Sequence, residues 1–331
     1  MAPSLTVRSI EDVLVAAAAA APSVHNSQPW YFSRGPEPGT LAVHASPRHA
    51  LPLTDPDTRA LHISVGAALG NLKAAAIQLG REPVIRLLPC PDRPGLLATV
   101  RLAGRPRAGL LRHPDLHQAI WRRRSSRLPF SPAPVPEALL GELAEAARLD
   151  GAELHRPGPA ESTRLLGLTT VADSRNALDP GRRRECLART TGPGDARALP
   201  VHAFGPRDAT GRLPVRSFGG LDEPPRDRTA PGSGPRLLLL TTRHDRRADW
   251  LRAGQALQHV LLLLTLRGLR ASMLHQALEW PDLRARLATA DADRCAPQML
   301  LRIGYGSPVV PTPRLPVPAL FDRQDASATG D

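Results

Sequence analysis

Apolar residues recur at helical spacing in two segments of the chain that share one pattern. The first segment contains Gly-Ala-Ala-Leu at residues 66–69 and ends at Gly80, and the second contains Gly-Gln-Ala-Leu at residues 254–257 and ends at Gly268. Both pairs of positions are offset by 188 residues (254 − 66 and 268 − 80). Glycine closes a helix in the left-handed conformation at the least steric cost. The two segments therefore predict two equivalent amphipathic helices, each closed by glycine.

Short apolar runs follow both predicted helices and extend the correspondence. Residues 84–88 come after the first helix and residues 271–274 after the second, and farther on Val-Arg-Leu at 100–102 matches Leu-Arg-Ile at 301–303. Runs of this length are consistent with buried strands. Two copies at so long a period indicate a duplicated domain and not a solenoid.

A further helix is predicted at the start of each half. Ser9 precedes Ile-Glu-Asp and an alanine-rich stretch that stops at Pro22, which is the pattern of a capped helix. Its counterpart starts near Pro136 and has leucines at its apolar positions. The sequence of helix, strand pair and helix in each half predicts an α+β fold with a first half at residues 1–112 and a second half at 113–331.

The second half contains additional residues. Near the start of the repeat Ala20 aligns with Ala146, an offset of 126, so the later offset of 188 requires 62 additional residues (188 − 126). We place this insertion at about residues 190–235, where glycine and proline are frequent and apolar periodicity is weak. A long irregular loop inside a compact domain is usually functional or disordered, and both alternatives stay open for this segment.

The composition is consistent with this organisation. A chain of 331 residues is long enough for two domains of ordinary size. Hydrophobic residues make up 42% of it but aromatic residues only 3%, so the core must consist mainly of Leu, Ala and Val. No Gly-x-Gly-x-x-Gly follows a predicted strand, which leaves a Rossmann nucleotide site without support.

The loop after the first helix carries the first candidate chemistry. Residues 21–30 read Ala-Pro-Ser-Val-His-Asn-Ser-Gln-Pro-Trp, so Ser23, Asn26 and Gln28 lie between two prolines that stiffen the chain. Short uncharged donors and acceptors on a rigid loop suit the edge of a flat heteroaromatic ring with carbonyl and imide groups, such as an isoalloxazine. The alternative is a helix-ending turn in which Ser and Asn only satisfy backbone groups.

A run of arginines after another predicted helix carries the second candidate chemistry. Residues 122–127 read Arg-Arg-Arg-Ser-Ser-Arg and follow a helical segment at 117–121. Arginines at alternate positions, with a hydroxyl between them, can form a doubly charged cradle for a phosphate. The alternative is a solvated basic face, which is the usual place of an arginine run.

Together the two motifs resemble those of the nitroreductase superfamily of FMN enzymes, in which an Arg-Arg-Ser-x-Arg-x-Phe segment is paired with a Pro-Ser-x-x-Asn-x-Gln-Pro-Trp segment. In that superfamily the arginine motif comes first, whereas here the order is reversed and each half keeps one motif. The closest resemblance is to the Acg family, whose members look like internally duplicated nitroreductases with a lid. The resemblance implies a nitroreductase-like fold, with two fused halves forming a single-chain pseudo-dimer and the 190–235 insertion forming the lid.

The resemblance also implies a cofactor, FMN, held between the two halves. The arginines and Ser125 would hold its phosphate and ribityl tail, and the polar loop would contact the edge of its ring. The cofactor-binding residues implied are Ser23, His25, Asn26, Gln28, Arg123, Ser125, Arg127 and Arg314. NAD(P)H would donate a hydride, which a nitroaromatic, quinone or similar small molecule would then accept. The rival within the resemblance is a protein that sequesters FMN without turnover under a closed lid.

The formal net charge of +12 and the pI of about 11.2 suggest a different class, an arginine-rich nucleic-acid binder. Lys73 is the only lysine, and the arginines are spread along a chain rich in Ala, Leu and Pro. The aromatic residues are also too few to form base-stacking platforms. We therefore expect no nucleic-acid partner.

Cysteines and histidines do not suggest a metal site. Cys90, Cys186 and Cys295 are far apart and odd in number, which fits neither metal spacing nor a disulfide framework. His113 and His117 are four residues apart but lack the glutamate of a zincin motif, so a helix start is the better interpretation. We predict no metal.

Two further features bear on location. The alanine-rich stretch follows acidic residues and not a basic region, so it does not fit a signal peptide. The apolar run at residues 260–264 is too short to span a bilayer. We expect a cytoplasmic protein without a membrane partner, present as a monomeric pseudo-dimer or a weak homo-oligomer.

Overall fold

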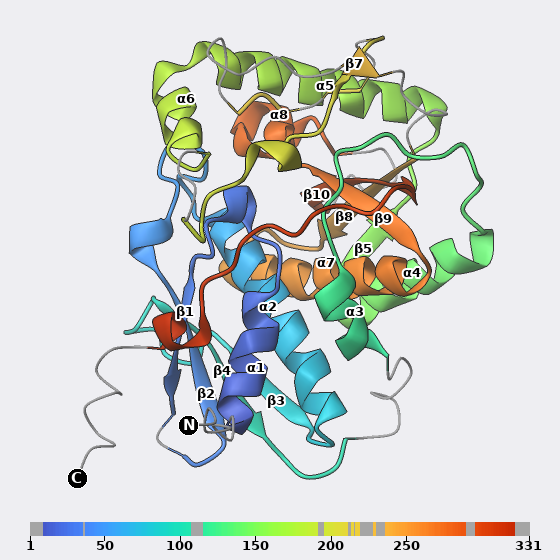
Figure 1. Cartoon of the computed structure of the whole chain (residues 1–331). Coiled ribbons are helices and arrows are strands. Elements are labelled where there is room, and N and C mark those ends of the chain that lie inside the picture. Colours follow the sequence, from blue (N-terminus) through green and yellow to red (C-terminus); the bar gives the residue numbers. More distant parts are fainter. Residues whose placement is uncertain are drawn as a thin grey trace, which may run out of the picture.

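Two four-stranded antiparallel sheets, each with its own helices, form the framework of the chain (Figure 1). The computed structural model describes residues 9–35, 37–106, 115–190, 195–210, 213–214, 216–218, 228–229, 236–288 and 295–321. The predicted α+β class is confirmed. The two sheets lie on either side of a pair of long central helices.

The first sheet has the strand order β1-β2-β4-β3. Neighbouring strands are antiparallel, and the apolar runs predicted at 84–88 and 100–102 lie in β3 and β4. The helices of this half pack their alanine- and leucine-rich faces against the sheet. The elements are α1 (Ile10–Ala19), β1 (Trp30–Arg34), β2 (Thr40–Ala45), α2 (Arg59–Gln78), β3 (Pro83–Leu87) and β4 (Leu96–Leu102), with short 3-10 turns η1 (Val24–Asn26) and η2 (Pro47–His49).

The second sheet has the order β5-β8-β10-β9, which is the same arrangement of first, second, fourth and third strand. Strands β8 and β10 are buried along nearly their whole length, as their leucine-rich sequences require. The elements are α4 (Glu137–Leu149), β5 (Glu153–His155), β8 (Arg236–Thr242), α7 (Arg247–Leu266), β9 (Leu269–Leu274), η6 (Gln276–Glu279), α8 (Pro281–Ala285) and β10 (Ala296–Tyr305). Helix α3 (Leu116–Arg122) precedes α4 in the second half, and the chain's described part ends after η8 (Val317–Leu320).

Helices α2 and α7 cross where the two halves meet, and equivalent residues contact each other there. A Cβ on Gly66 would lie 2.2 Å from the Leu251 carbonyl oxygen, and a Cβ on Gly254 would lie 2.1 Å from the Ile63 carbonyl oxygen. Because Leu251 and Ile63 are also offset by 188 (251 − 63), these two contacts are related by the repeat. Equivalent positions of the repeat therefore meet at this crossing.

The predicted helix ends are confirmed. Ser9 and Asp12 form a capping box at the start of α1, with the Asp12 amide donating to Ser9 Oγ at 3.1 Å. Gly80 and Gly268 follow α2 and α7 with φ of 70° and 75°. These are left-handed conformations that glycine adopts without a steric penalty, so the two helices end at equivalent positions.

The segment between β5 and β8, residues 156–235, is the main difference between the halves. It begins earlier than the predicted insertion at about 190–235 and contains two helices that the weak apolar periodicity did not predict. Its elements are α5 (Pro159–Leu178), α6 (Pro180–Leu187), η4 (Val201–Ala203), β6 (Arg207–Asp208) and β7 (Arg228–Thr229). Of the predicted insertion, residues 191–194, 211–212, 215, 219–227 and 230–235 lie outside the described residues.

Helix α2 is also the one described helix that is long and apolar enough to cross a membrane. Of its most apolar window, 78% is buried inside the protein, as expected for the central helix of a folded core. Its Leu and Ala side chains pack into the first-half core, whereas Ile63 belongs to the core of the second half. Leu251 of α7 in turn packs into the first-half core, so the two cores interlock.

Candidate functional site

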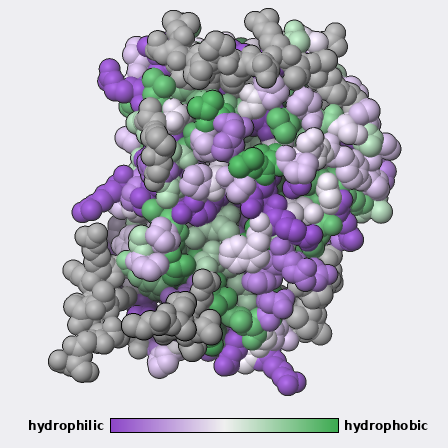
Figure 2. Space-filling view, viewed as in Figure 1, coloured by the Kyte–Doolittle hydropathy of each residue, from purple (hydrophilic) through white to green (hydrophobic). Residues whose placement is uncertain are grey.

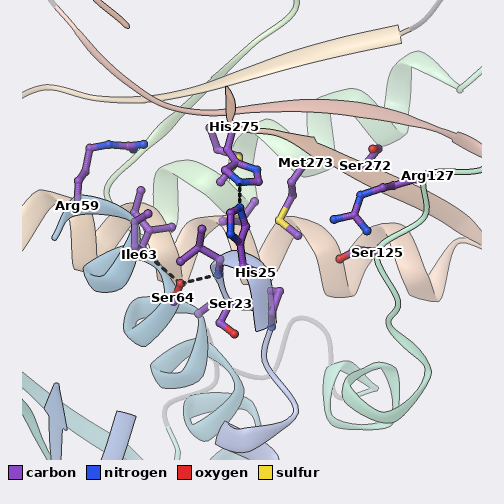
Figure 3. A pocket seen from close by; sticks show the side chains of 16 residues that line it. Ser23, His25, Arg59, Ile63, Ser64, Ser125, Arg127, Ser272, Met273 and His275 are labelled. Atoms are coloured by element: carbon purple, nitrogen blue, oxygen red, sulfur yellow. Dashed lines mark hydrogen bonds between the residues drawn. The ribbon is translucent and has the colours of Figure 1, made fainter. Parts of the chain in front are cut away.

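A cavity of about 660 Å³ lies where the two halves meet (Figure 3). The polar loop after α1, the start of α2, the arginine motif and the end of β9 all contribute to its wall. Figure 3 shows His25 and His275 in contact with each other, joined by a hydrogen bond, with Arg59 and Arg127 on opposite sides of them. Its lining residues are Pro22, Ser23, Val24, His25, Arg59, Ala60, Ile63, Ser64, Ala67, Ser125, Arg127, Leu257, Ser272, Met273, His275 and Met299.

The polar loop has a strained backbone that its contacts hold in place. His25, Asn26 and Gln28 have φ of 48°, 58° and 46°, in the left-handed region that non-glycine residues rarely adopt. The Gln28 amide donates to Ser23 Oγ at 3.0 Å, and the Val24 amide donates to the Ser64 hydroxyl of α2 at 3.2 Å. These bonds fix the loop on α2 and turn the His25 ring toward the cavity.

Asn26 and Gln28 use their side chains to join this loop to two distant segments. Asn26 Nδ2 donates to the Ala198 carbonyl at 3.2 Å, and its Oδ1 accepts a bond from Arg314 Nη1 at 2.7 Å. Gln28 Nε2 donates to the Ala196 carbonyl at 2.7 Å, and its Oε1 accepts from the Leu315 amide at 2.9 Å. These contacts position the loop, the insertion and the C-terminal segment, and give both amides partners other than a ring edge.

The arginine motif is held against the second sheet. Ser125 forms a parallel bridge with Ala271 of β9, and the Ser126 amide donates to the Ala271 carbonyl at 2.9 Å. Arg127 Nη1 donates to the Ala203 carbonyl of the insertion at 2.6 Å. The bridge places Ser125 and Arg127 on the cavity wall opposite the start of α2.

Three guanidinium groups gather at the far end of a second, adjoining cavity of about 550 Å³. Arg123 is only 4% exposed, and burial together with nearby Arg314 and Arg124 lowers its pKa to about 9. Burial and Arg124 also lower the pKa of Arg314 to about 10. Among the described residues, no carboxylate forms a salt bridge with these three arginines. The cluster is therefore an uncompensated positive site beside a cavity.

The buried arginines also have hydrogen-bonding capacity left over. Arg123 Nε and Arg314 Nε are buried without a hydrogen-bond partner in the protein. The remaining bonds of Arg123 are long, 3.4 Å to Ser125 Oγ and 3.5 Å to the Ala20 carbonyl. A phosphate accepts charge-assisted bonds from several guanidinium groups at once, so the cluster fits the phosphate of a flavin nucleotide.

The structure thus brings seven of the eight predicted residues to one cavity system. The cavity of about 550 Å³ shares Pro22, Ser23, His25, Ser125, Arg127 and Met273 with the larger one and adds Asn26, Arg123, Arg124, Leu199, Ala203, Val309, Val310, Thr312 and Arg314. Gln28 is fully buried behind the loop and lines neither cavity. Motifs almost 100 residues apart in the sequence therefore meet at one place.

A buried polar cluster closes the cavity on the side of the insertion. His275 Nε2 lies 3.4 Å from His25 Nε2 and 3.3 Å from Glu279 Oε1. The Arg216 guanidinium contacts Glu279, and this attraction holds the pKa of Arg216 above its ordinary value although burial lowers it. Burial and Arg216 lower the pKa of both histidines well below 6.5, so both are neutral at pH 7.

Among the described residues, the same cluster contains a group that could hold a metal ion. Ligand-type atoms of His25, His275 and Glu279 lie within 4.8 Å of one another. However, the Arg216 guanidinium lies on Glu279 and 3.3 Å from His275 Nε2, so the cluster already contains a cation. We therefore interpret it as a buried ion pair that attaches the insertion to the second half.

Sequence reasoning missed the residues that long-range contacts bring to the site. Arg59 begins α2, is buried, and donates to the Gln298 carbonyl at 2.8 Å. Arg216 reaches the cluster from an insertion with no periodic pattern, and only its charge could have marked it. Of the two histidines predicted at a helix start, His117 has its ring centroid 6.1 Å from that of Trp121, and His113 lies outside the described residues.

Comparison with known proteins adds relatives of similar length. No family model matches the chain. It is 31% identical over 315 residues to "Putative NAD(P)H nitroreductase Rv3131" of Mycobacterium tuberculosis, covering 93% of this chain and 89% of the relative. It is 26% identical over 307 residues to "Putative NAD(P)H nitroreductase acg" of the same organism, covering 91% and 92%.

Solved structures give a partial likeness. The FMN and NADPH-dependent nitroreductase NfnB from sphigopyxis sp. strain HMH matches with a TM-score of 0.40 and 21% identity, covering 62% of this chain and 97% of that one. The nitroreductase-like family protein from Bacillus cereus matches with a TM-score of 0.38 and 16% identity, covering 62% and 94%. On the strength of the full-length relatives, the chain belongs to the nitroreductase superfamily as an Acg-like member.

Proposed function

We propose that the protein is an FMN-dependent NAD(P)H oxidoreductase that reduces a small-molecule acceptor such as a nitroaromatic or a quinone. The observation that carries the proposal is the cluster of the buried Arg123 with the half-buried Arg124 and Arg314, on the wall of a cavity lined by both halves. Such a cluster favours an anion, and the adjoining cavity is lined by residues of both motifs. Full-length relatives that bear the name "Putative NAD(P)H nitroreductase" support the same activity.

The residues divide into three roles. Arg123 and Arg314 would hold the phosphate, with Ser125 and Arg127 along the ribityl chain. Ser23 and His25 would contact the ring from the polar loop. Asn26 and Gln28 would act indirectly, without contacting the flavin. Asn26 orients Arg314, and Gln28 fixes the C-terminal segment.

Bound FMN would supply the hydride chemistry, and the protein would supply position and electrostatic field. Arg59 and Arg127 stand on opposite sides of the larger cavity, and each contributes a positive charge to its wall. A positive potential stabilises negative charge that develops on a reduced ring or an acceptor. The neutral histidines do not add to this charge at pH 7.

One observation favours a second candidate, a protein that binds FMN without turnover. Phe218 of the insertion is buried, and its ring meets the His25 ring at 5.9 Å between centroids. The Arg127 guanidinium lies 4.9 Å from the centroid of the same ring. In this arrangement the insertion covers the cavity beside His25, which would restrict the approach of a nicotinamide.

The two candidates are separated by one experiment in two steps. The purified protein is incubated with FMN and desalted, and retained absorbance near ~450 nm, the property of oxidised flavin, establishes binding. NADH or NADPH is then added without oxygen. Bleaching supports the oxidoreductase, retained colour without bleaching supports the sequestering protein, and a colourless protein contradicts both. We also propose a cytoplasmic location and a monomeric pseudo-dimer as the working state.

The residue assignment has its own test. Arg123→Ala removes a buried guanidinium from the phosphate cluster, and a charge-assisted bond is worth about 1.5–3 kcal/mol, so FMN affinity should fall roughly 10- to 100-fold. Arg122→Ala is the matched control, because Arg122 is the exposed neighbour in the same run. Flavin fluorescence titration measures both. Equal affinities for the two variants would contradict the assignment.

A further inference from the structure

A third cavity lies on the outer side of the arginine cluster. It has a volume of about 820 Å³ and is bounded by the end of α1, by α3 and by the C-terminal segment. We name it the outer groove. Its lining residues are Ala16, Ala19, Ala20, Ile120, Trp121, Arg123, Arg124, Pro311, Thr312, Arg314, Leu315, Pro316 and Val317. On the face drawn in Figure 2, hydrophobic surface lies between hydrophilic residues over the area where Figure 1 shows these elements.

The outer groove continues the cavity system of the proposed flavin site. Arg123, Arg124 and Arg314 line both the outer groove and the cavity of about 550 Å³, which in turn shares six residues with the larger cavity. The three spaces therefore adjoin one another, with the guanidinium cluster bordering both the second and the third. A ligand whose charged part lies on the cluster can extend in both directions.

The walls of the outer groove suit a flat apolar ring. Apart from the arginines and Thr312, its lining is alanine, proline and branched aliphatic side chains with one aromatic, Trp121. On α3, Ala119 and Ile120 face the core, whereas Trp121 stays 45% exposed. A large aromatic side chain left this exposed beside a basic cluster can stack on a nucleobase, since every base has a π-face.

The positive charge of the guanidinium cluster suits a diphosphate. Three guanidinium groups meet there, and no described carboxylate forms a salt bridge with them. A diphosphate carries two negative charges on adjacent groups and can accept bonds from several arginines at once. A flavin dinucleotide consists of a flavin ring, a diphosphate and an adenine, in this order. These parts match the inner cavity, the guanidinium cluster and the apolar outer groove.

We propose that the outer groove binds the adenosine half of a flavin dinucleotide, with its diphosphate on Arg123, Arg124 and Arg314 and its adenine against Trp121. The protein then accepts FAD as well as FMN, and the outer groove gives FAD the higher affinity. This proposal rests on the flavin site proposed above. It makes Trp121 a residue that distinguishes the dinucleotide from the mononucleotide.

The test compares the binding of FAD, FMN and ADP to the full-length protein freed of co-purified flavin. Flavin fluorescence gives the two flavin affinities, and tryptophan fluorescence follows ADP. We expect FAD to bind about 10-fold or more tightly than FMN, which is the size of effect that one base stacked on an aromatic ring produces. ADP should quench tryptophan fluorescence and compete with FMN for the arginine cluster.

Two substitutions assign the effect to Trp121. Trp121→Ala should abolish the advantage of FAD and leave FMN affinity within about 2-fold, while Trp121→Phe, which keeps an aromatic face, should retain most of it. Leu178→Ala, at an exposed apolar residue on α5, is the control for loss of surface apolar area. Unchanged melting temperatures show that each variant is folded.

The outcomes separate this proposal from the flavin site itself. If FMN fails to bind, the flavin site is wrong and the proposal falls with it. If FMN binds but FAD has no advantage, or if Trp121→Ala keeps that advantage, the outer groove does not bind adenosine and the flavin site stands. If ADP binds equally well with FMN saturating, the adenosine belongs to a separate nucleotide, and the assignment to FAD is overturned.

Discussion

The two halves share one strand order but differ in the connection between their first two strands. In the first half, residues 35–39 join β1 to β2, whereas in the second half residues 156–235 join β5 to β8. The short connection leaves a plain hairpin, and the long one brings Arg216 and Phe218 to the cavity beside His25. The symmetric part of the molecule therefore supplies the framework, and the asymmetric part completes and covers the site.

The same contrast holds for the two motifs. The polar loop after α1 has no counterpart after α4, and the arginine motif before α4 has none among the described residues before α1. Each half thus keeps one side of a site, and the packing of α2 on α7 brings the two sides together. The difference teaches that each half contributes one of the two motifs to the proposed site, so neither half could form that site alone.

The largest expected effect comes from detaching the insertion. Glu279 accepts bonds from Asn176 at 2.9 Å and from Arg182 at 3.4 Å, both in the insertion, and pairs with Arg216. Removing one partner of a buried ion pair costs about 3–5 kcal/mol, so Glu279→Gln should lower the free energy of unfolding by roughly this amount. Urea denaturation measures it.

The control for this substitution lies three residues farther along. Asp282 also pairs with an insertion arginine, Arg175, at 2.9 Å, but its side chain is 55% exposed whereas that of Glu279 is 4% exposed. Asp282→Asn should leave the unfolding curve unchanged, because exposed pairs contribute little. Similar losses for the two variants would show that the buried cluster does not anchor the insertion.

The next largest expected effect tests the crossing of α2 and α7, which belongs to the symmetric part of the molecule. Gly66→Ala would place a methyl group 2.2 Å from a backbone oxygen of α7, and Gly254→Ala would do the same at 2.1 Å on α2. Backbone oxygens cannot move aside separately, so the helices must separate, and we expect a loss of about 3 kcal/mol for each variant. Urea denaturation should give the two variants similar losses because the contacts are equivalent.

Gly141→Ala serves as the control for helix propensity in this comparison. Gly141 lies in α4, and a Cβ there would meet nothing within 4 Å. Alanine favours a helix over glycine by about 1 kcal/mol, so this variant should be slightly more stable. A tolerant Gly66→Ala together with an intolerant Gly254→Ala would mean that the crossing is not symmetric.

A smaller effect depends on pH and distinguishes His62 from Trp250, the residue at the equivalent position of the second half. His62 and Trp250 are offset by 188 (250 − 62), and their rings meet at 5.5 Å between centroids. Burial lowers the pKa of His62 from 6.5 to about 4, with Arg247 contributing in the same direction. The unfolded chain therefore binds more protons than the folded one between these values, and stability is lost as the pH falls below 6.5.

This pH dependence can be removed at one position. A single group of this kind contributes a slope of about 1.4 kcal/mol per pH unit. His62→Gln should lower the slope of unfolding free energy against pH by up to that amount between pH 4 and 6.5. Denaturant titrations at four pH values measure the slope. The same slope in both proteins would show that His62 does not titrate with a lowered pKa.

The smallest effect distinguishes the first helices of the two halves. Ser9 caps α1 with its side chain, whereas α4 begins after Pro136 without a side-chain cap. Loss of such a cap costs about 1 kcal/mol, so Ser9→Ala should lower the melting temperature by a few degrees. Ser307→Ala, at an exposed serine outside the helices, is the control. No difference between the two variants would mean that the start of α1 does not contribute to stability.

Much of the symmetric framework could be predicted from the sequence, because its information is local. The cap at Ser9, the closing glycines at 80 and 268 and the apolar runs of β3 and β9 all depend on neighbours a few residues away. The offset of 188 then related the two helices before any contact was known. The meeting of the two motifs was predicted from the resemblance to the nitroreductase superfamily and not from these local signals.

The insertion and the exact contacts of the site could not be predicted in the same way. Helices α5 and α6 carry little apolar periodicity; α5 packs against η6, and α6 packs against α5. The partners of Asn26, at Ala198 and Arg314, are more than 170 residues away in sequence. Residue type indicated that Asn26 and Gln28 form hydrogen bonds, but only the fold shows with which groups.

The central claim is that two motifs from different halves form one flavin site per chain, and stoichiometry tests it most directly. Titration of the flavin-free protein with FMN, followed by calorimetry, counts the sites. The account predicts one FMN per chain, because the loop of residues 22–28 and the arginines of residues 123–127 each occur once. Two FMN molecules per chain, or none, would contradict it.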